Sequence, residues 1–329
     1  MTLAQLIDDF NEWKSPYRGD FVNHVPMAQY ALYQMTGSLE KVQEFTEYAK
    51  RELNADAREK NPKALQTLYD VLGKPDGYSS AYEYLKKVDA SELQPILKEV
   101  LNQYPEAMSS GLFHVMIRLA YALEGESEDE LRRALAYYVS AYKKAVPFTR
   151  TVPPKKLPES LAELSLHPET KRILSDYDGI GNRLKAMANS ETYMKEGFIL
   201  EGSAAEQEQA LLSLLSSSYQ QSGSIIALHG ITGLHAFKVL EPYYDDPAKA
   251  FDLFVTACIN HLLMMDYSTD FTAEPELSEE PSWDEILKTS SLSRDVHTLK
   301  LAYSAFELEE TYGFKKRGLK ADQKRRLSG

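Results

Sequence analysis

Four of the seven histidines in this 329-residue chain stand in separate apolar segments, where imidazole serves either as a core side chain or as a catalytic or metal-binding group. They are His24, His114, His229 and His297. A single buried histidine is usually a core residue satisfied by one hydrogen bond. Four of them on four different predicted helices favour a shared site, because imidazole is a common protein ligand for metals.

The local sequence around these histidines indicates how each is held. His24 precedes Val25 and Pro26, which predict a helix start, and the helix dipole there keeps imidazole neutral and able to bind a metal. His229 lies in an apolar segment over residues 225–236, whose two glycines allow a ligand or another backbone to approach closely. His235 follows six residues later on a different helix face, so we rank it below the other four histidines as a ligand.

Two cationic residues share predicted helices with these histidines. Arg118 follows His114 by four residues, which makes it a candidate for orienting an oxyanion or supporting a ligand. Lys300 follows His297 by three residues in a run otherwise poor in charge. Because burial of an unpaired ammonium is costly, we expect either an acidic partner or a neutral amine that points toward the histidines. A neutral amine can take up carbon dioxide and form a carbamate, whose anionic oxygen would complete a metal site.

Several common chemistries lack their motifs in this sequence. No Walker A loop, G-x-S-x-G elbow or H-E-x-x-H motif is present, and residues 179–184 lack the third glycine of a dinucleotide fingerprint. No flavin motif is seen. The single Cys258 forms no intrachain disulfide and suits core packing better than nucleophilic catalysis. His167, followed by Pro168 and Glu169, indicates a helix start.

The elements that must position these residues are helices. Apolar residues recur at three- and four-residue spacing almost throughout, and this pattern predicts an all-α fold of roughly 14–18 helices. Proline at three predicted first turns and a capping box at residues 282–285 mark helix starts. We expect one large domain of two packed halves over residues 1–312, with a candidate internal boundary near residues 146–158. The acidic, aperiodic residues 266–281 form a candidate lid near the mouth of the histidine site.

The overall charge restricts the class of partner. The chain has 37 Lys and Arg against 49 Asp and Glu, and this acidic balance argues against nucleic-acid binding. Basic residues crowd the last positions, so residues 313–329 are predicted to be a solvated basic tail. The start of the sequence does not resemble a signal peptide, and no apolar run reaches membrane-spanning length. We therefore expect a cytoplasmic protein that does not associate with membranes, while the oligomeric state is not predicted.

Four segments together resemble the questin oxidase-like proteins of fungal and bacterial secondary metabolism. The segments are FVNHVPMAQYALY (21–33), FHVMIRLAYALE (113–124), LHGITG (228–233) and DVHTLKL (295–301). Fungal members are oxygenases that open anthraquinone-type rings, either as non-heme iron dioxygenases or as flavin-free Baeyer–Villiger monooxygenases that use NADPH. This chain departs from them at Pro26, Met27 and Arg118, where fungal members tend to carry further histidines.

The resemblance implies a site. In the iron enzymes of the family the metal is bound by four histidines and a carboxylated lysine, which correspond to His24, His114, His229, His297 and Lys300. We therefore expect an oxidoreductase that activates dioxygen at a non-heme metal beside an aromatic or polyketide-like substrate. One alternative is an NADPH-dependent, metal-free monooxygenase in which these histidines act as acid, base and oxyanion partners. Another is a non-catalytic helical protein that binds a small apolar ligand or a protein partner.

Overall fold

The computed structural model describes residues 1–13, 17–18, 21–52, 62–144, 156–157, 159–194, 200–266, 268–277, 281–314 and 318–328. Most of the candidate boundary at 146–158 lies outside these residues, as do residues 315–317 and 329 of the predicted tail and residues 267 and 278–280 of the predicted lid. The described part contains 17 α-helices, so the predicted all-α class and helix number are confirmed. The only strands assigned there are β1 (Tyr17–Arg18) and β2 (Phe21–Val22), a short antiparallel pair.

In the first half of the chain, the described residues form seven α-helices and four short 3₁₀ helices. They are α1 (Leu3–Trp13), α2 (Val25–Thr36), α3 (Leu39–Glu52), η1 (Leu68–Val71), η2 (Pro75–Gly77), α4 (Tyr78–Leu85), η3 (Ala90–Glu92), α5 (Leu93–Gln103), η4 (Pro105–Ser109), α6 (His114–Glu124) and α7 (Glu128–Ser140).

In the second half, ten α-helices and one further 3₁₀ helix are found in the part of the chain that the structure covers. They are α8 (Glu159–Leu166), α9 (Pro168–Asp176), α10 (Ile180–Ala188), α11 (Glu191–Met194), α12 (Ala204–Ser222), α13 (Ile225–Leu240), η5 (Glu241–Tyr243), α14 (Pro247–Leu263), α15 (Trp283–Ser290), α16 (Val296–Glu310) and α17 (Leu319–Ser328). No helix of the described residues has both the length and the apolar character needed to cross a membrane.

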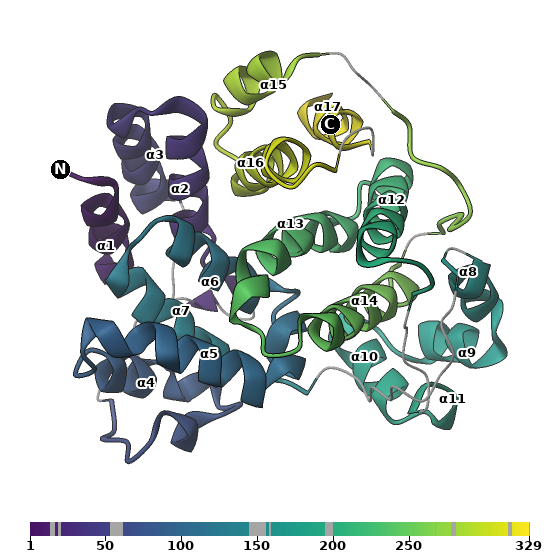
Figure 1. Cartoon of the computed structure of the whole chain (residues 1–329), viewed down its shortest axis with the longest axis horizontal. Coiled ribbons are helices and arrows are strands. Elements are labelled where there is room, and N and C mark those ends of the chain that lie inside the picture. The colour runs from purple at the N-terminus through teal and green to yellow at the C-terminus, as the bar shows by residue number, and fades with distance from the viewer. Residues whose placement is uncertain are drawn as a thin grey trace.

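Helix α13 is the central element of the molecule (Figure 1). It is apolar on nearly every face and packs against α6, α12, α14 and α16. Its two glycines explain this close packing. A Cβ atom at Gly230 would lie 2.4 Å from a methyl carbon of Leu215 on α12, and one at Gly233 would press on Phe254 and Phe113. The close approach that these glycines were predicted to allow is thus made by neighbouring side chains.

Helix starts follow the predicted signals. Pro26, Pro168 and Pro247 each lie in the first turn of a helix. The N–H groups of a first turn have no acceptor within the helix, so a proline there costs no hydrogen bond. Ser282 and Glu285 form the predicted capping box at the start of α15. These local signals are confirmed because each depends only on the few residues around the helix start.

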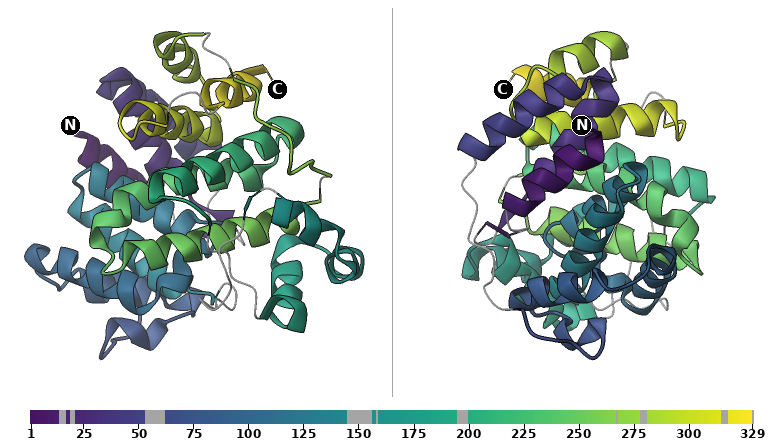
Figure 2. Two further views of the ribbon diagram at one scale, coloured as in Figure 1. Left: turned by 45° about the vertical axis from the view of Figure 1, so that its right-hand side comes forward. Right: turned by 90° about the vertical axis from the view of Figure 1, so that its left-hand side faces the viewer.

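Within residues 313–329, the part that the structure describes is not a solvated tail. Helix α17 packs against α12, α15 and α16. Both views in Figure 2 show this last helix, next to the end marked C, beside the other helices drawn in yellow-green. Leu319, Asp322 and Gln323 on this helix are fully buried. The prediction from charge was wrong for this helix, because its basic residues occupy one part of the surface while the others face the core.

Residues 268–277 are tied to α12 along their length. The side-chain amide of Gln221 donates to the carbonyl of Asp270 (2.9 Å), and its oxygen accepts from the Asp270 N–H (2.9 Å). Gln220 makes the same pair of bonds with the backbone of Glu276 (3.2 and 2.6 Å). This anchoring supports an ordered connection, so the lid predicted for residues 266–281 gains no support from the described contacts.

Candidate metal centre

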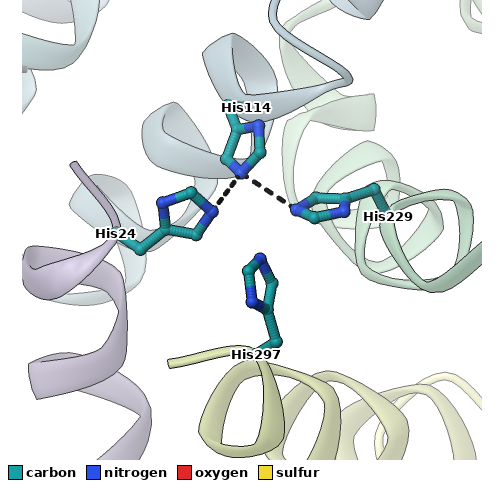
Figure 3. A group of neighbouring side chains, drawn as sticks. All are labelled: His24, His114, His229 and His297. Atoms are coloured by element: carbon teal, nitrogen blue, oxygen red, sulfur yellow. Dashed lines mark hydrogen bonds between the residues drawn. The ribbon is translucent and has the colours of Figure 1, made fainter. Parts of the chain in front are cut away.

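Four helices bring their N-terminal ends to one point. His24 immediately precedes α2, His114 opens α6, His297 is the second residue of α16, and His229 lies in the second turn of α13. Figure 3 shows the four rings turned toward a common centre, each from a different helix. Packing of α2 on α16, of α6 on α13 and of α13 on α16 holds these ends together.

The ring nitrogens are close enough to share one ion. His114 Nε2 lies 2.7 Å from His24 Nε2 and 2.9 Å from His229 Nε2. One nitrogen from each of the four rings lies within 4.8 Å of the others. Ligands bound at about 2.1 Å lie about 3.0 Å apart when at right angles and about 4.2 Å apart when opposite. The predicted convergence of the rings is confirmed, whereas their role as metal ligands stays a prediction.

Hydrogen bonds fix the tautomers of two rings. His114 Nδ1 contacts the carbonyl oxygen of Gly111, and His229 Nδ1 contacts that of Ile225 at 2.7 Å. Because a carbonyl oxygen only accepts, both Nδ1 atoms must carry the proton. A neutral imidazole has one proton, so both Nε2 atoms are bare and face each other at 2.9 Å. Neither can donate to the other, and a cation is what would satisfy both.

The electrostatics of the site favour neutral imidazoles. Burial, followed by the nearby charge of Lys300, holds the pKa of His114 well below its ordinary value. Burial and the neighbouring His114 do the same for the pKa of His229. Burial also lowers the pKa of His297, although Asp295 opposes this effect. Neutral imidazole is the form that binds metals, so the rings are ready to act as ligands near pH 7.

The turn before α6 has an unusual backbone. Gly111, Leu112 and Phe113 have φ angles of 59°, 57° and 65°, so three consecutive residues occupy the left-handed region. This region costs a residue with a side chain on the order of 1 kcal/mol or more. The turn carries the Gly111 carbonyl to His114 Nδ1, and strain of this kind is typical of functional sites. The sequence analysis missed it, since only Gly111 signals a turn here.

Lys300 is fully buried, and its amine has no hydrogen-bond partner among the described residues. The acidic partner expected for a buried ammonium is therefore not found in that part of the chain. Burial lowers the pKa of Lys300 to about 7, so a large share of the amine is neutral at physiological pH. Its charge, when present, lowers the pKa values of His114, His229 and His297. This coupling supports an amine that lies close to the histidines.

Arg118 is paired with a carboxylate of the neighbouring helix. Its Nε and Nη2 atoms donate to the two carboxylate oxygens of Glu130 on α7, at 2.6 and 3.0 Å. Both side chains are buried, and Ser127 caps the helix that carries Glu130. The pair therefore joins α6 to α7. A role for Arg118 in orienting an oxyanion stays a prediction, and no sequence pattern identified Glu130 as its partner.

The other three histidines lie outside the cluster. His235 Nδ1 contacts Ser304 Oγ at 3.1 Å, and its Nε2 lies 3.4 Å from the carboxylate of Glu124. His261 Nδ1 donates to the carbonyl of Ala257 at 2.8 Å. His167 accepts from a backbone N–H in the first turn of α9, as a helix start requires. The expectation that His235 lies apart from the four rings is confirmed.

A second polar layer lies farther along the same four helices, and the sequence analysis missed it. Its members follow the four histidines by six or seven residues: Tyr30, Tyr121, His235, Tyr303 and Ser304. A helix rises 1.5 Å per residue, so this layer is about 9–10 Å beyond the histidines. Tyr121 and Ser304 share a hydrogen bond of 3.0 Å, and Tyr303 donates to Glu124 at 2.8 Å. The repeated six- to seven-residue spacing after each histidine was the available signal.

Comparison with known families gives a match over most of the chain. The family model described as Questin oxidase-like matches residues 21–305, which include the four clustered histidines and Lys300. A search of curated proteins finds no match to this chain.

Proposed function

Because the chain belongs to the questin oxidase-like family, we propose that it is an oxygenase in which the four clustered histidines bind one divalent metal, iron in our proposal. Family membership indicates an oxidoreductase, and the histidine cluster is compatible with a metal. Imidazole nitrogens with one hard oxygen ligand suit iron, and also zinc or nickel. When bound, the metal would supply dioxygen activation toward an aromatic or polyketide-like substrate.

The observation that carries this proposal is the pair of bare nitrogens at the centre of the cluster. His114 and His229 each donate Nδ1–H to a carbonyl, and their Nε2 lone pairs converge at 2.9 Å. A proton on His24 Nε2, 2.7 Å away, would satisfy His114 Nε2 alone, whereas a divalent cation would satisfy both acceptors at once. The carbonyls of Gly111 and Ile225 then act as outer partners that fix the direction of each lone pair.

The four rings differ in exposure, and this difference indicates a direction of access. His114 and His229 are buried, whereas His24 and His297 are half-buried. Substrate would therefore approach from the side of α2 and α16. The rings of His114 and His229 close the opposite side of the site, where water is excluded and charge interactions are stronger.

Lys300 is our candidate for the anionic ligand. Its neutral amine would attack carbon dioxide, forming one N–C bond and releasing one proton to leave a carbamate, as the family resemblance implies. The absence of a hydrogen-bond partner for the amine among the described residues supports this proposal. The carbamate oxygens would add the negative charge that four neutral imidazoles lack.

Metal analysis tests the proposed function. We expect freshly purified protein to contain close to one equivalent of iron or another divalent metal, measured by elemental analysis. His114→Ala and His229→Ala should each reduce Co²⁺ binding at least about tenfold, followed by the visible absorption of bound Co²⁺. The exposed His167→Ala variant is the matched control and should bind like the wild type.

Assays of NADPH and oxygen consumption, made alongside the metal analysis, distinguish the alternative functions. Wild-type protein that binds no metal but consumes NADPH with an anthraquinone-type substrate would favour the metal-free monooxygenase. Protein that neither binds metal nor consumes oxygen or NADPH would favour a non-catalytic role. Lys300→Arg keeps a positive charge but forms no carbamate, so full metal content and oxygen consumption in that variant would exclude Lys300 from the ligand set.

A further inference from the structure

Helix α17 lies outside the segment that the family model matches, yet it reaches the start of α16, which carries His297. Figure 1 places α17 beside α16 and α12. Its Arg326 donates to Asp295 through Nη2 at 2.5 Å and through Nε at 3.2 Å. Arg326 Nε also lies 3.2 Å from Thr298 Oγ1. One guanidinium thus binds two residues that flank His297.

Asp295 has two functions at this helix start. As the N-cap of α16 it accepts hydrogen bonds from the backbone N–H and the hydroxyl of Thr298, at 2.9 and 2.6 Å. Its other carboxylate oxygen faces His297, 3.4 Å from the backbone nitrogen and 3.8 Å from the ring Nδ1. Asp295 Oδ1 thus lies within ion-pair distance of the outer ring nitrogen of a proposed metal ligand, although beyond hydrogen-bond distance, and Arg326 binds the other oxygen of the same carboxylate.

Helix α17 is itself fixed by two buried polar side chains. Asp322 accepts from Ser216 on α12 at 2.7 Å and from Gln220 at 2.9 Å. Gln323 donates to Ser290 on α15 at 2.8 Å and to the Thr298 carbonyl at 3.3 Å. These contacts join α17 to α12, α15 and α16 on the same helix that carries Arg326.

We propose that Arg326 is a positioning residue, which acts through Asp295 to hold the ring of His297 in the orientation that a metal requires. This inference rests on the proposed metal centre. A histidine ligand is usually oriented by a carboxylate or carbonyl on its other nitrogen, and loss of that partner typically weakens metal binding 10- to 100-fold. For His114 and His229 the partner is a carbonyl of a neighbouring turn. For His297 the carboxylate beside Nδ1 is Asp295, at 3.8 Å, and this carboxylate is bound by a helix beyond the matched segment.

The test measures Co²⁺ affinity of the full chain well below its unfolding temperature. We expect Arg326→Gln to bind Co²⁺ about 10-fold more weakly than the wild type and to change the visible spectrum of the bound ion. Arg325→Gln removes the same charge from an exposed position of the same helix and should leave both unchanged. In an Asp295→Ser background, which keeps an N-cap, Arg326→Gln should have little further effect.

Each outcome decides the proposal. Equal Co²⁺ affinity and an identical spectrum in Arg326→Gln and wild type would overturn it and leave the metal centre intact. A lower unfolding temperature without a change in affinity would do the same, because that is the signature of a merely structural contact. If Arg326→Gln does not fold, Arg326→Lys is measured instead and is expected to show a smaller loss of the same kind. Wild-type protein that binds no Co²⁺ would overturn the metal centre itself.

Discussion

Lys300 places a basic amine in an environment that is unfavourable for its charged form. The Lys300 side chain is fully buried, and its amine has no hydrogen-bond partner among the described residues. The sequence indicated burial from the apolar run around it, and this is confirmed. The sequence could not identify what surrounds the amine, because the helices that supply His114 and His229 are distant in the chain and meet α16 only in the fold.

Replacement of Lys300 by Met tests this environment. The pKa of Lys300 falls from 10.5 to about 7, so between these values the unfolded chain holds a proton that the folded protein lacks. Stability of the metal-free protein therefore rises with pH across this window, and the lysine is most destabilising at pH 7 and below. We expect Lys300→Met to stabilise the metal-free protein by about 1–4 kcal/mol at pH 7. The gain should shrink toward pH 10, as measured by urea unfolding in carbon dioxide-free buffer.

A second lysine provides the control. Lys238 is partly buried, but hydrogen bonds with Glu208 and Glu241 outweigh burial and raise its pKa. Lys238→Met should therefore lower stability, the opposite sign. A Lys300→Met protein that is less stable than wild type at pH 7 would show that the amine is charged and paired in the folded state.

Helices differ in how well the sequence predicted them. Starts marked by Pro26 or by the capping box at Ser282 were predictable, since their signals are local. Helix α17 was not, because its many basic residues obscure the buried Leu319 and Gln323 that fix it. The pairing of Arg118 with Glu130 also escaped prediction, although the two are only 12 residues apart. A net charge or a single spacing does not show which side of a helix meets another element.

The connection over residues 268–277 provides a test at the level of one element. Asp270 lies outside any helix or strand, and the side-chain amide of Gln221 provides the hydrogen-bond partners for both its backbone N–H and its backbone carbonyl. We expect Gln221→Ala to destabilise the protein by about 1–2 kcal/mol and to speed amide hydrogen exchange in this connection. The exposed Gln94→Ala variant on α5 is the control and should leave exchange unchanged. Unchanged exchange in Gln221→Ala would show that other contacts hold the connection.

The stacked layers give the whole molecule its organisation. Helices α2, α6, α13 and α16 carry one histidine layer near their N-terminal ends and one tyrosine-rich layer beyond it. In the first layer imidazole nitrogens contact mainly one another, whereas Tyr121, Tyr303 and Ser304 of the second bond to other protein groups. The free-energy cost of burying imidazole nitrogens without suitable partners therefore falls on the histidine layer. A cation bound there would reduce this cost and stabilise the folded protein.

This organisation predicts how the stability of the molecule depends on pH. Burial holds the pKa values of His114 and His229 well below 6.5 and lowers that of His261 to about 4. Below pH 6.5 the unfolded chain therefore binds protons that the folded protein excludes, and stability falls as pH falls. Each histidine contributes up to about 1.4 kcal/mol per pH unit. Asp322 has the opposite effect on stability and offsets the effect of about one histidine. Burial raises its pKa to about 8, so as pH falls the folded protein takes up this proton before the unfolded chain does.

We therefore expect the metal-free protein to lose on the order of 2–3 kcal/mol per pH unit between about pH 6 and 5 from these groups, measured by urea unfolding. His261→Leu should reduce this slope by about one proton, while the exposed His167→Ala should leave it unchanged. Saturating Co²⁺ should add stability at pH 7, since a ligand that binds only the folded protein shifts unfolding by mass action. Because His114 and His229 resist protonation, that added stability should persist below pH 6.5. Loss of the Co²⁺ effect at pH 6.5 would instead show that ordinary, exposed histidines bind the ion.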